Sequence, residues 1–371
     1  MLCFAHMATA RILCVVGARP NFMKMAPIVH ALARKPTRFK SVLVHTGQHY
    51  DAAMSKVFFD ELQMPRPDVD LNVGSGSHAA QTAAIMAAFE PVVLERRPNL
   101  VIVVGDVNST IACALVAVKI GVKVAHVEAG LRSFDRSMPE EINRLLTDQI
   151  SELLFTTEEG ARDNLLREGI DDDRIHFVGN VMIDTLLAHR DRAKSLDAVA
   201  RHGLNGRFGL VTLHRPANVD DREAFAGLFS ALEVIASEVP LVFPVHPRTR
   251  TSLMASERAQ RLVASGRLTL LEPLGYLEFI GLMQASTVVL TDSGGIQEET
   301  TILGIPCLTL RNNTERPSTV THGTNVIAGT SPERILKAWR ELKTASTERR
   351  TPPLWDGNAA ARIADVLDRL L

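Results

Sequence analysis

The sequence predicts an α/β protein with two Rossmann-like domains, each built on a parallel sheet covered by helices. Short apolar runs alternate with helical patterns, and this alternation occurs twice along the chain. The chain has 371 residues, 46% of them hydrophobic, which is more than one typical core needs and enough for two. Because ligands of such sheets bind beyond the carboxyl ends of the strands, we expect the loops after the strands to face a cleft between the domains.

The first domain is expected at residues 10–185, after a leader at residues 1–9 in which Met7 could be the true start. An apolar run at 12–16, the glycine turn GARPNFMKMAP and a helix through about Arg34 form its first strand–turn–helix unit. Further strands are predicted at 41–45, 100–104, 122–127, 153–156 and 175–178, with helices at 78–95, 108–120 and 158–167.

A polar helical stretch at 186–206 is expected to connect the domains, and the second domain to occupy 207–356. Its strands are predicted at 209–213, 241–245, 268–271, 288–290 and 307–310, with helical stretches from Arg222, Thr249, Tyr276 and Ile296. The closing segment, 357–371, has apolar residues at helical spacing, and the first domain is the candidate surface for this helix.

Composition excludes several classes of function. Lys and Arg number 41 against 42 acids, a net charge of -1, so no nucleic-acid or membrane partner is expected. The four widely spaced cysteines fit reduced core thiols, which favours a cytoplasmic location, and no apolar run could span a bilayer. The sequence has no HExxH and no paired CxxC, so no metal is expected, and it has neither a Ser-His-Asp motif nor a GxxxxGK[ST] loop. The Gly-x-Gly at Gly74 and Gly76 is the only one near a predicted helix start and follows no strong strand, so no nicotinamide cofactor is expected.

The stretch TDSGGIQEE, residues 291–299, is the clearest candidate for a ligand site. It joins a buried strand to a helix, so that glycines and bare amide N–H groups meet the positive end of the helix dipole. We expect a phosphate there. The alternative is an ordinary strand-to-helix turn in which Ser293 is only the N-cap.

Three carboxylates stand where strands end or a helix begins in the first domain: Asp106, Glu128 and Glu140. Helix capping and the helix dipole offer a structural explanation for Asp106 and Glu140. Glu128, between an apolar strand and an Ala-Gly turn, has no such explanation. Three carboxylates in one site of low dielectric would raise the pKa of at least one of them, and would provide the acid and base for proton transfer.

Cationic and imidazole side chains also follow the strands. Arg19 and Lys24 come after the first strand, either as a solvated basic pair or as cations beside a diphosphate or carboxylates. His214 and His246 end two strands of the second domain. They are as well explained by a structural role as by a functional one.

Taken together, these motifs resemble those of the bacterial non-hydrolysing UDP-N-acetylglucosamine 2-epimerases, from about residue 11 to beyond residue 330. The resemblance is carried by GARPNFMKMAP, TGQHYDAAMS, VVGDVNST, HVEAGLRS, PEEINR, GNVMIDTL, VTLHRPANVD, PVHPRTR, EPLGYLEFIGLM, TDSGGIQEE and TERPSTVTHGTN, in this order. It implies the two-domain GT-B architecture and the interconversion of UDP-GlcNAc and UDP-ManNAc, usually for surface polysaccharide synthesis. A homodimer is expected from the family and from the frequency of such assemblies.

The resemblance also implies a role for each matching residue. Proton transfer would fall to Asp106, Glu128, Glu140 and His214, and the diphosphate to Ser293, Gly294, Gly295, Arg19 and Arg316. Glu299 would accept the ribose hydroxyls, Lys24 would contact the substrate, and Phe279 would form a wall of the uracil pocket.

The implied reaction needs no cofactor. The C2 proton of UDP-GlcNAc is next to no carbonyl, so elimination of UDP across C1 and C2, followed by re-addition, is the expected route. Four alternatives stay open: a 2-epimerase for a 2,3-diacetamido uronic acid nucleotide, an epimerase that hydrolyses its product, a GT-B glycosyltransferase, and a nucleotide-sugar sensor without turnover.

The sequence departs from the family pattern at two places. Members that their own substrate activates carry an allosteric patch that begins QHR-x-M, where this chain has Gln48 and His49 followed by Tyr50 and Asp51. Gln48 and His49 therefore remain candidates for an allosteric contact, but strong activation of that type is not expected. HRPAN in place of HRRES also leaves the identity of the sugar open.

Overall fold

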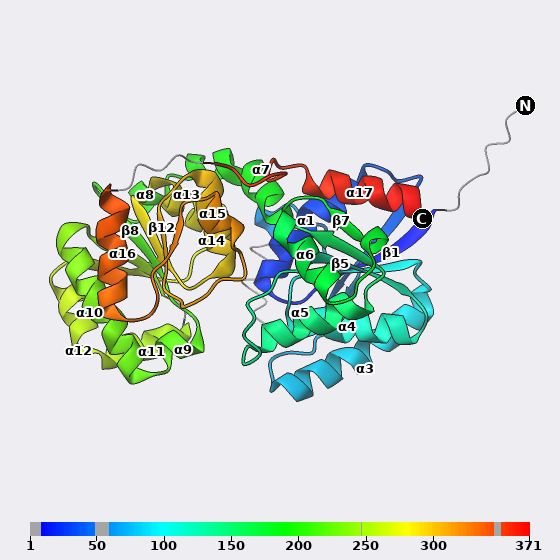
Figure 1. Ribbon diagram of the computed structural model, residues 1–371, viewed down its shortest axis with the longest axis horizontal. Helices are drawn as coiled ribbons and strands as arrows, with labels where there is room; N and C mark the ends of the chain where they lie inside the picture. The colour runs from blue at the N-terminus through cyan, green and yellow to red at the C-terminus, as the bar shows by residue number, and fades with distance from the viewer. Residues whose placement is uncertain (1–8, 49–58, 246, 345–349) are drawn as a thin grey trace, which may run out of the picture. The chain divides into compact units, whose positions relative to one another are not determined.

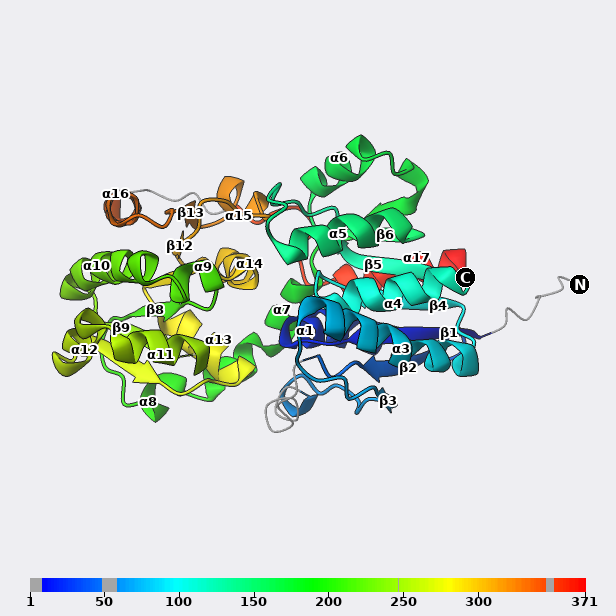
Figure 2. The same cartoon turned by 90° about the horizontal axis from the view of Figure 1, so that it is seen from below.

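The computed structural model describes residues 9–48, 59–245, 247–344 and 350–371. The chain forms two compact units, one comprising Met1–Ala188 with Pro353–Leu371 and the other His189–Pro352 (Figures 1 and 2). Each unit has its own parallel sheet, so the predicted α/β class with two Rossmann-like domains is confirmed.

The sheet of the first unit has seven strands in the order β3-β2-β1-β4-β5-β6-β7, all parallel. The strands are β1 (Ala10–Val16), β2 (Phe39–His45), β3 (Val69–Asp70), β4 (Leu100–Val104), β5 (Lys123–Ala129), β6 (Leu153–Thr156) and β7 (Ile175–Phe177). Every residue of β4 is buried and apolar, as expected for a central strand with helices on both faces. The strand order reverses beside β1, which places the ends of β1 and β4 at the switch point of the sheet.

Helices connect these strands and cover the sheet. They are α1 (Arg19–Ala33), α3 (His78–Arg96), α4 (Asn108–Lys119), α5 (Pro139–Ile150), α6 (Glu159–Arg167), the 3₁₀ turn Asp172–Arg174, and α7 (Val181–Ser195), which runs from this unit into the other. The C-terminal helix α17 (Ala359–Leu370) belongs to this unit and packs on α1 (Figure 1).

Ion pairs and a helix cap hold α17 to the first unit. Lys35 and Arg38 both pair with Asp368. At the other end of α17, Asp184 accepts hydrogen bonds from the backbone N–H groups of Ala359 and Ala360, at 3.1 and 2.7 Å. A carboxylate from α7 thus caps a helix that lies more than 170 residues further along the chain.

The second unit has a six-stranded parallel sheet in the order β10-β9-β8-β11-β12-β13. The strands are β8 (Gly209–Thr212), β9 (Leu241–Pro244), β10 (Leu268–Leu271), β11 (Val288–Thr291), β12 (Cys307–Thr309) and β13 (Asn325–Ile327). The helices are α8 (Ala198–Arg201), α9 (Pro216–Val219), α10 (Arg222–Glu238), α11 (Pro247–Ala255), α12 (Glu257–Ala264), α13 (Tyr276–Ala285), α14 (Gly294–Leu303), α15 (Ser318–Thr321) and α16 (Pro332–Thr344).

The predicted strands agree with the observed ones to within two residues at each end. The sequence did not predict β3 and β13, which have two and three residues and form edges of their sheets. The stretch expected as a connection, 186–206, forms the second half of α7 and the short helix α8. Within the described part of the chain, no helix has the length and apolarity needed to cross a membrane.

Candidate active site

The carboxyl ends of β4 and β5 bring charged groups of the first unit together. Lys24, on α1, places its Nζ 2.7 Å from Oε1 of Glu128, and both side chains are buried. Gly105, between β4 and Asp106, has a φ of +65°, and a Cβ there would lie 2.8 Å from Nζ of Lys24. The left-handed backbone therefore favours glycine at this position, and a side chain there would have to displace the ammonium of Lys24.

Glu128 itself stands in an irregular part of β5. The pairing register with β6 shifts between Val127 and Ala129, and Glu128 has a φ of +77°. A bulge turns a side chain away from the alternation of the strand, and a left-handed conformation costs free energy for any residue except glycine. The bulge gives Glu128 an orientation that a regular strand would not.

Asp106 belongs to a second charged group, which centres on Arg144 of α5. The guanidinium of Arg144 pairs with Asp106 and also donates to Oε2 of Glu141, from Nε at 3.1 Å and from Nη2 at 2.6 Å. Glu141 in turn accepts hydrogen bonds from the backbone N–H groups of Ser133 and Phe134, at 3.0 and 2.9 Å. Burial alone would raise the pKa of Glu141, but these donors outweigh it and hold the pKa below its ordinary value.

The ion pairs of Arg144 with Asp106 and Glu141 were not predicted from the sequence, which named only Glu140 of this helix as a candidate for catalysis. Glu140 lies exposed in the first turn of α5, whereas its neighbour Glu141 is buried. The available signal was the motif PEEINR, because residues 141 and 144 are three apart and so share one face of a helix. The catalytic role of Glu140 remains a prediction.

In the second unit, Asp292 follows β11 and is fully buried. It accepts hydrogen bonds from the backbone N–H groups of His214 and Arg215 and from the amide of Asn218, and it lies 2.8 Å from Nδ1 of His214. Burial would raise the pKa of Asp292, but the donors, His214 first, lower it below its usual value. The ionised carboxylate therefore orients the half-exposed His214 ring and assigns the basic lone pair of the neutral ring to Nε2.

The predicted phosphate site is a helix N-terminus beside an arginine. Ser293 occupies the N-cap position of α14, but its side chain makes no capping hydrogen bond. A Cβ on Gly294 would overlap the guanidinium of Arg316 and would lie 2.7 Å from Oε1 of Glu315. Ser293, Gly294 and Arg316 are thus neighbours, which is the arrangement that favours an anion.

Acidic side chains hold Arg316 in place. Its Nε donates to Glu298 at 2.8 Å and its Nη1 to Glu315 at 2.5 Å, and Arg311 also pairs with Glu315 at 2.8 Å. Burial would raise the pKa of Glu315, but Arg316 and Arg311 hold it well below its ordinary range. The charge of Arg316 is therefore fixed in position before any ligand binds.

The predicted ribose contact, Glu299, is buried on the same helix. It accepts a hydrogen bond of 3.0 Å from the hydroxyl of Tyr276 on α13. Burial raises the pKa of Glu299 to about 8. Phe279, the predicted wall of the uracil pocket, is half-buried on α13 three residues after Tyr276.

The other predicted residues are placed only in part. His49 and His246 lie outside the described residues, and so does the side chain of Arg19, although its backbone begins α1. Gln48 is buried, and its Oε1 accepts hydrogen bonds from the backbone N–H and the hydroxyl of Ser109, at 3.0 and 2.6 Å. These hydrogen bonds link the loop after β2 to the start of α4 through the side chain of Gln48. The described residues contain no cluster of His, Cys, Asp and Glu that could hold a metal ion.

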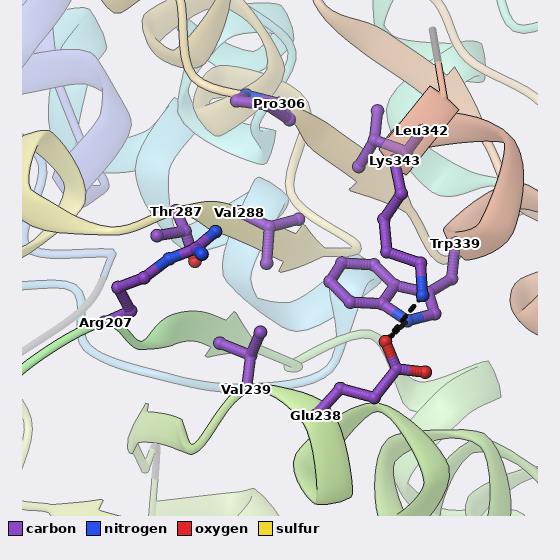
Figure 3. Close-up of a pocket in the computed structure, with 9 residues that line it drawn as sticks. All are labelled: Arg207, Glu238, Val239, Thr287, Val288, Pro306, Trp339, Leu342 and Lys343. Carbon is purple, nitrogen blue, oxygen red and sulfur yellow. Dashed lines mark hydrogen bonds and ion pairs between the residues drawn. The ribbon is translucent and has the colours of Figure 1, made fainter.

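A cavity of about 470 Å³ lies elsewhere in the second unit (Figure 3). Residues before or at the start of β8, β11 and β12 line it, together with Trp339 and Lys343 of α16. Three of its polar side chains bond to one another, since Glu238 accepts a hydrogen bond from Lys343 at 2.6 Å and one from Trp339 at 3.2 Å. It opens at the amino ends of the strands and none of the predicted site residues lines it, so we do not assign the candidate active site there.

The fold places this protein in a broad structural class. Two Rossmann-like sheets in tandem are the GT-B architecture, and the crystal structure of the glycotransferase of kitacinnamycin shares the fold, with a TM-score of 0.61 at 12% identity. More specifically, residues 30–368 match the family model described as UDP-N-acetylglucosamine 2-epimerase. The chain belongs to the UDP-N-acetylglucosamine 2-epimerase family.

Relatives of known name cover almost the whole chain. A UDP-N-acetylglucosamine 2-epimerase of Methanococcus maripaludis is 42% identical over 359 residues, 95% of this chain and 97% of the relative. A UDP-2,3-diacetamido-2,3-dideoxy-D-glucuronate 2-epimerase of Pseudomonas aeruginosa is 41% identical over 363 residues, 97% of this chain and 100% of the relative. The resemblance to the UDP-N-acetylglucosamine 2-epimerases is confirmed, but its restriction to bacteria is not, because these relatives are archaeal as well as bacterial. That the reaction is non-hydrolysing stays a prediction.

Solved structures of named UDP-GlcNAc 2-epimerases are also similar to this chain over nearly its whole length. The crystal structure of the Methanocaldococcus jannaschii UDP-GlcNAc 2-epimerase in complex with UDP-GlcNAc and UDP has a TM-score of 0.90 and 40% identity, and the match covers 97% of this chain and 99% of that one. The UDP-GlcNAc-bound enzyme of Neisseria meningitidis has a TM-score of 0.87 and 30% identity.

Proposed function

We propose that this protein interconverts UDP-GlcNAc and UDP-ManNAc without a cofactor. Membership of the family supports this proposal, as does the similarity to a Methanocaldococcus jannaschii enzyme solved with UDP-GlcNAc and UDP. The structural observation that supports it most directly is two ion pairs at the carboxyl ends of β4 and β5, the buried pair of Lys24 with Glu128 and the pair of Arg144 with the partly buried Asp106.

The proposed reaction begins with elimination. A basic side chain takes the C2 proton, the C1–O bond to the diphosphate breaks, and a double bond forms between C1 and C2. The same steps in reverse then deliver a proton to the opposite face of C2 and re-form the C1–O bond. Removal and delivery on opposite faces need at least two proton-transfer groups, for which we propose Asp106, Glu128, Glu140 and His214.

The leaving group also needs stabilisation. We propose that the backbone of Ser293, Gly294 and Gly295, at the start of α14, and the guanidinium of Arg316 hold the diphosphate. Because its acidic partners already fix Arg316, stabilising the charge that develops on the diphosphate requires little reorganisation. In the same proposal Arg19 assists at the diphosphate, Lys24 contacts the substrate, Glu299 accepts from the ribose, and His246 and Phe279 complete the binding site.

A related sugar is the second candidate substrate. The Pseudomonas aeruginosa relative, at 41% identity, is named for a UDP-2,3-diacetamido uronic acid. That nucleotide has the same UDP leaving group and the same acetamido substituent at C2, so the proposed chemistry would serve either sugar. The two substrates, each supplied alone and then in competition, give the ratio of kcat/KM that decides between them.

Proton NMR in D₂O tests the proposed reaction. Purified protein with UDP-GlcNAc is expected to give UDP-ManNAc carrying deuterium at C2, in a mixture with deuterated UDP-GlcNAc. Free ManNAc and UDP would instead show an epimerase that hydrolyses its product, and the absence of both exchange and product would refute the proposal. Sedimentation analysis tests the accompanying proposal of a homodimer, and cell fractionation that of a cytoplasmic location.

A further inference from the structure

The first unit also contains an ionic cluster, beside the candidate catalytic carboxylates, that takes no part in the proposed reaction. His126 on β5 and Asp148 on α5 are both fully buried, with Nδ1 of the ring 2.6 Å from Oδ1 of the carboxylate. Arg132 pairs with the other oxygen of Asp148 at 2.7 Å and with Glu168 at 2.6 Å. The side chains of His126, Asp148 and Arg132 are thus fully buried, and the partly exposed Glu168 closes the cluster at its edge.

The hydrogen bonds of this cluster show where its protons are. Nε2 of His126 lies 2.8 Å from the carbonyl oxygen of Gly105, which can only accept, so Nε2 carries a proton. Burial would raise the pKa of Asp148, but His126 and Arg132 lower it overall, and the ionised carboxylate also only accepts. Both ring nitrogens of His126 therefore donate, and the ring has no lone pair left for catalysis.

The cluster connects two segments that begin 23 residues apart in the sequence, the turn Gly105–Asp106 after β4 and the bulged end of β5 with the turn that follows, Glu128–Gly130; we call these the two loops. His126 holds the carbonyl of Gly105, the residue before Asp106. Asp148 accepts a 3.1 Å hydrogen bond from the backbone N–H of Gly130, two residues after Glu128. One His–Asp pair therefore fixes the backbone beside both candidate proton-transfer residues, in addition to the 3.0 Å backbone hydrogen bond from the N–H of Gly105 to the carbonyl of Val127.

Glu128 needs such support because its backbone is strained. A non-glycine residue with a φ of +77° in a bulge persists only where the surroundings fix it. His126 precedes the bulge by two residues and Gly130 follows it by two, so the cluster holds the chain on both sides. A cluster of apolar side chains could fill the same space, but it could not anchor a carbonyl on one loop and an N–H on the other.

We infer that His126 and Asp148 are positioning residues, which set the distance between the carboxylates of Asp106 and Glu128 by fixing their two loops. The inference rests on the proposed function for its catalytic consequence only. Neither residue exchanges a proton with the substrate. A misplacement of a catalytic group by about 1 Å can cost on the order of 100-fold in rate, so the consequence is measurable.

The substitutions His126→Gln and Asp148→Asn test the inference. Glutamine can place an amide N–H near the position of Nε2 but has no equivalent of Nδ1, so the bond to Gly105 can persist while the link to Asp148 is lost. Asparagine at 148 keeps the shape but cannot accept from all three donors. For each variant we expect kcat to fall by on the order of 10- to 100-fold while KM stays within about two-fold.

A matched control separates positioning from a general loss of stability. Asp184→Asn also removes a buried carboxylate of the first unit, one that contacts α17 and neither loop. We expect it to lower the melting temperature and leave kcat within about two-fold of wild type. If the kcat of His126→Gln and of Asp148→Asn falls no further than that of Asp184→Asn, the inference is wrong.

Amide hydrogen exchange tests the link between the loops without using activity. In Asp148→Asn the N–H of Gly130 loses its acceptor, and the N–H of Gly105, which donates to the carbonyl of Val127 at 3.0 Å, reports whether its turn has loosened. We expect exchange of both amides to be faster by about 10-fold or more in Asp148→Asn, and of neither in Asp184→Asn. Acceleration at only one of the two, or at none, would overturn the inference. A wild-type protein that catalyses no epimerisation would refute the proposed function, and the exchange measurement would then still decide whether the pair couples the loops.

Discussion

Nζ of Lys24 lies 2.7 Å from Oε1 of Glu128, although 104 residues separate the two in the sequence. Both side chains are almost completely buried. Each charge therefore stabilises the other, because a buried charge that lacks a partner loses its hydration free energy without the compensating attraction of an opposite charge.

Removal of one member of this pair is expected to destabilise the first unit. Lys24→Met should lower its free energy of unfolding by about 3–5 kcal/mol, because it leaves the carboxylate of Glu128 buried without the ammonium. The double variant Lys24→Met, Glu128→Gln removes both charges and should be more stable than the sum of the single effects predicts. Urea unfolding followed by the fluorescence of Trp355, in a Trp339→Phe background, reports this unit alone, since the chain has only 2 tryptophans. Strict additivity would show that the two charges do not interact.

Neutralising Asp106 should abolish most of the activity and leave nucleotide binding intact. We expect Asp106→Asn to lower kcat by about 10²- to 10⁴-fold, the usual contribution of a proton-transfer group, with UDP affinity by calorimetry unchanged. Asp172→Asn is the control, because it makes the same chemical change at an exposed carboxylate that pairs with Arg162 at the surface. Retention of wild-type turnover by Asp106→Asn would remove this residue from the proposed mechanism.

A methyl group at Gly294 should weaken nucleotide binding. Its Cβ would overlap the guanidinium of Arg316, which would have to leave its position beside the start of α14. We expect Gly294→Ala to weaken UDP binding by about 10-fold or more, measured by calorimetry, since a charge-assisted contact is worth about 1.5–3 kcal/mol. Gly227→Ala on α10 is the matched control, because there the new methyl group meets Pro332 at an ordinary 3.6 Å. Equal UDP affinity in the two variants would argue against a diphosphate at this helix start.

The stability of the second unit should fall as pH rises through the neutral range. Burial raises the pKa of Glu299 from 4.5 to about 8, so the native state binds more protons than the unfolded state between these values. The contribution of Glu299 is complete below pH 4.5 and is lost as pH rises to about 8. Asp292 and Glu315 act in the opposite direction at lower pH, since their pKa values are lowered and their contribution is lost on acidification.

Glu299→Gln should remove this loss of stability, because an amide does not titrate. Unfolding by urea at pH 5, 6, 7 and 8, followed by Trp339 in a Trp355→Phe background, measures the second unit alone. A wild-type stability that is as flat with pH as that of Glu299→Gln would show that Glu299 is ionised in the native state at neutral pH.

Local patterns predicted most of the fold. The strands β4, β6 and β10 were predicted with the bounds that the structure has, because a short, mostly apolar run is recognisable from its own residues. The edge strands β3 and β13 were missed because neither contains a buried apolar residue, so neither stands out as an apolar run.

For the candidate site, the sequence by itself determined which strand ends carry charged side chains, and with the family motifs it named Lys24, Asp106, Glu128 and the turn at Ser293. Only the tertiary structure decided which charges meet. In the folded chain Arg144 pairs with Asp106 and with Glu141. Glu141 is buried whereas its neighbour Glu140 is exposed, and His126 contacts Asp148. The physical reason is that a strand or helix start is specified by neighbours in the chain, whereas an ion pair is specified by distance in space. Segments far apart in the sequence set that distance when they pack.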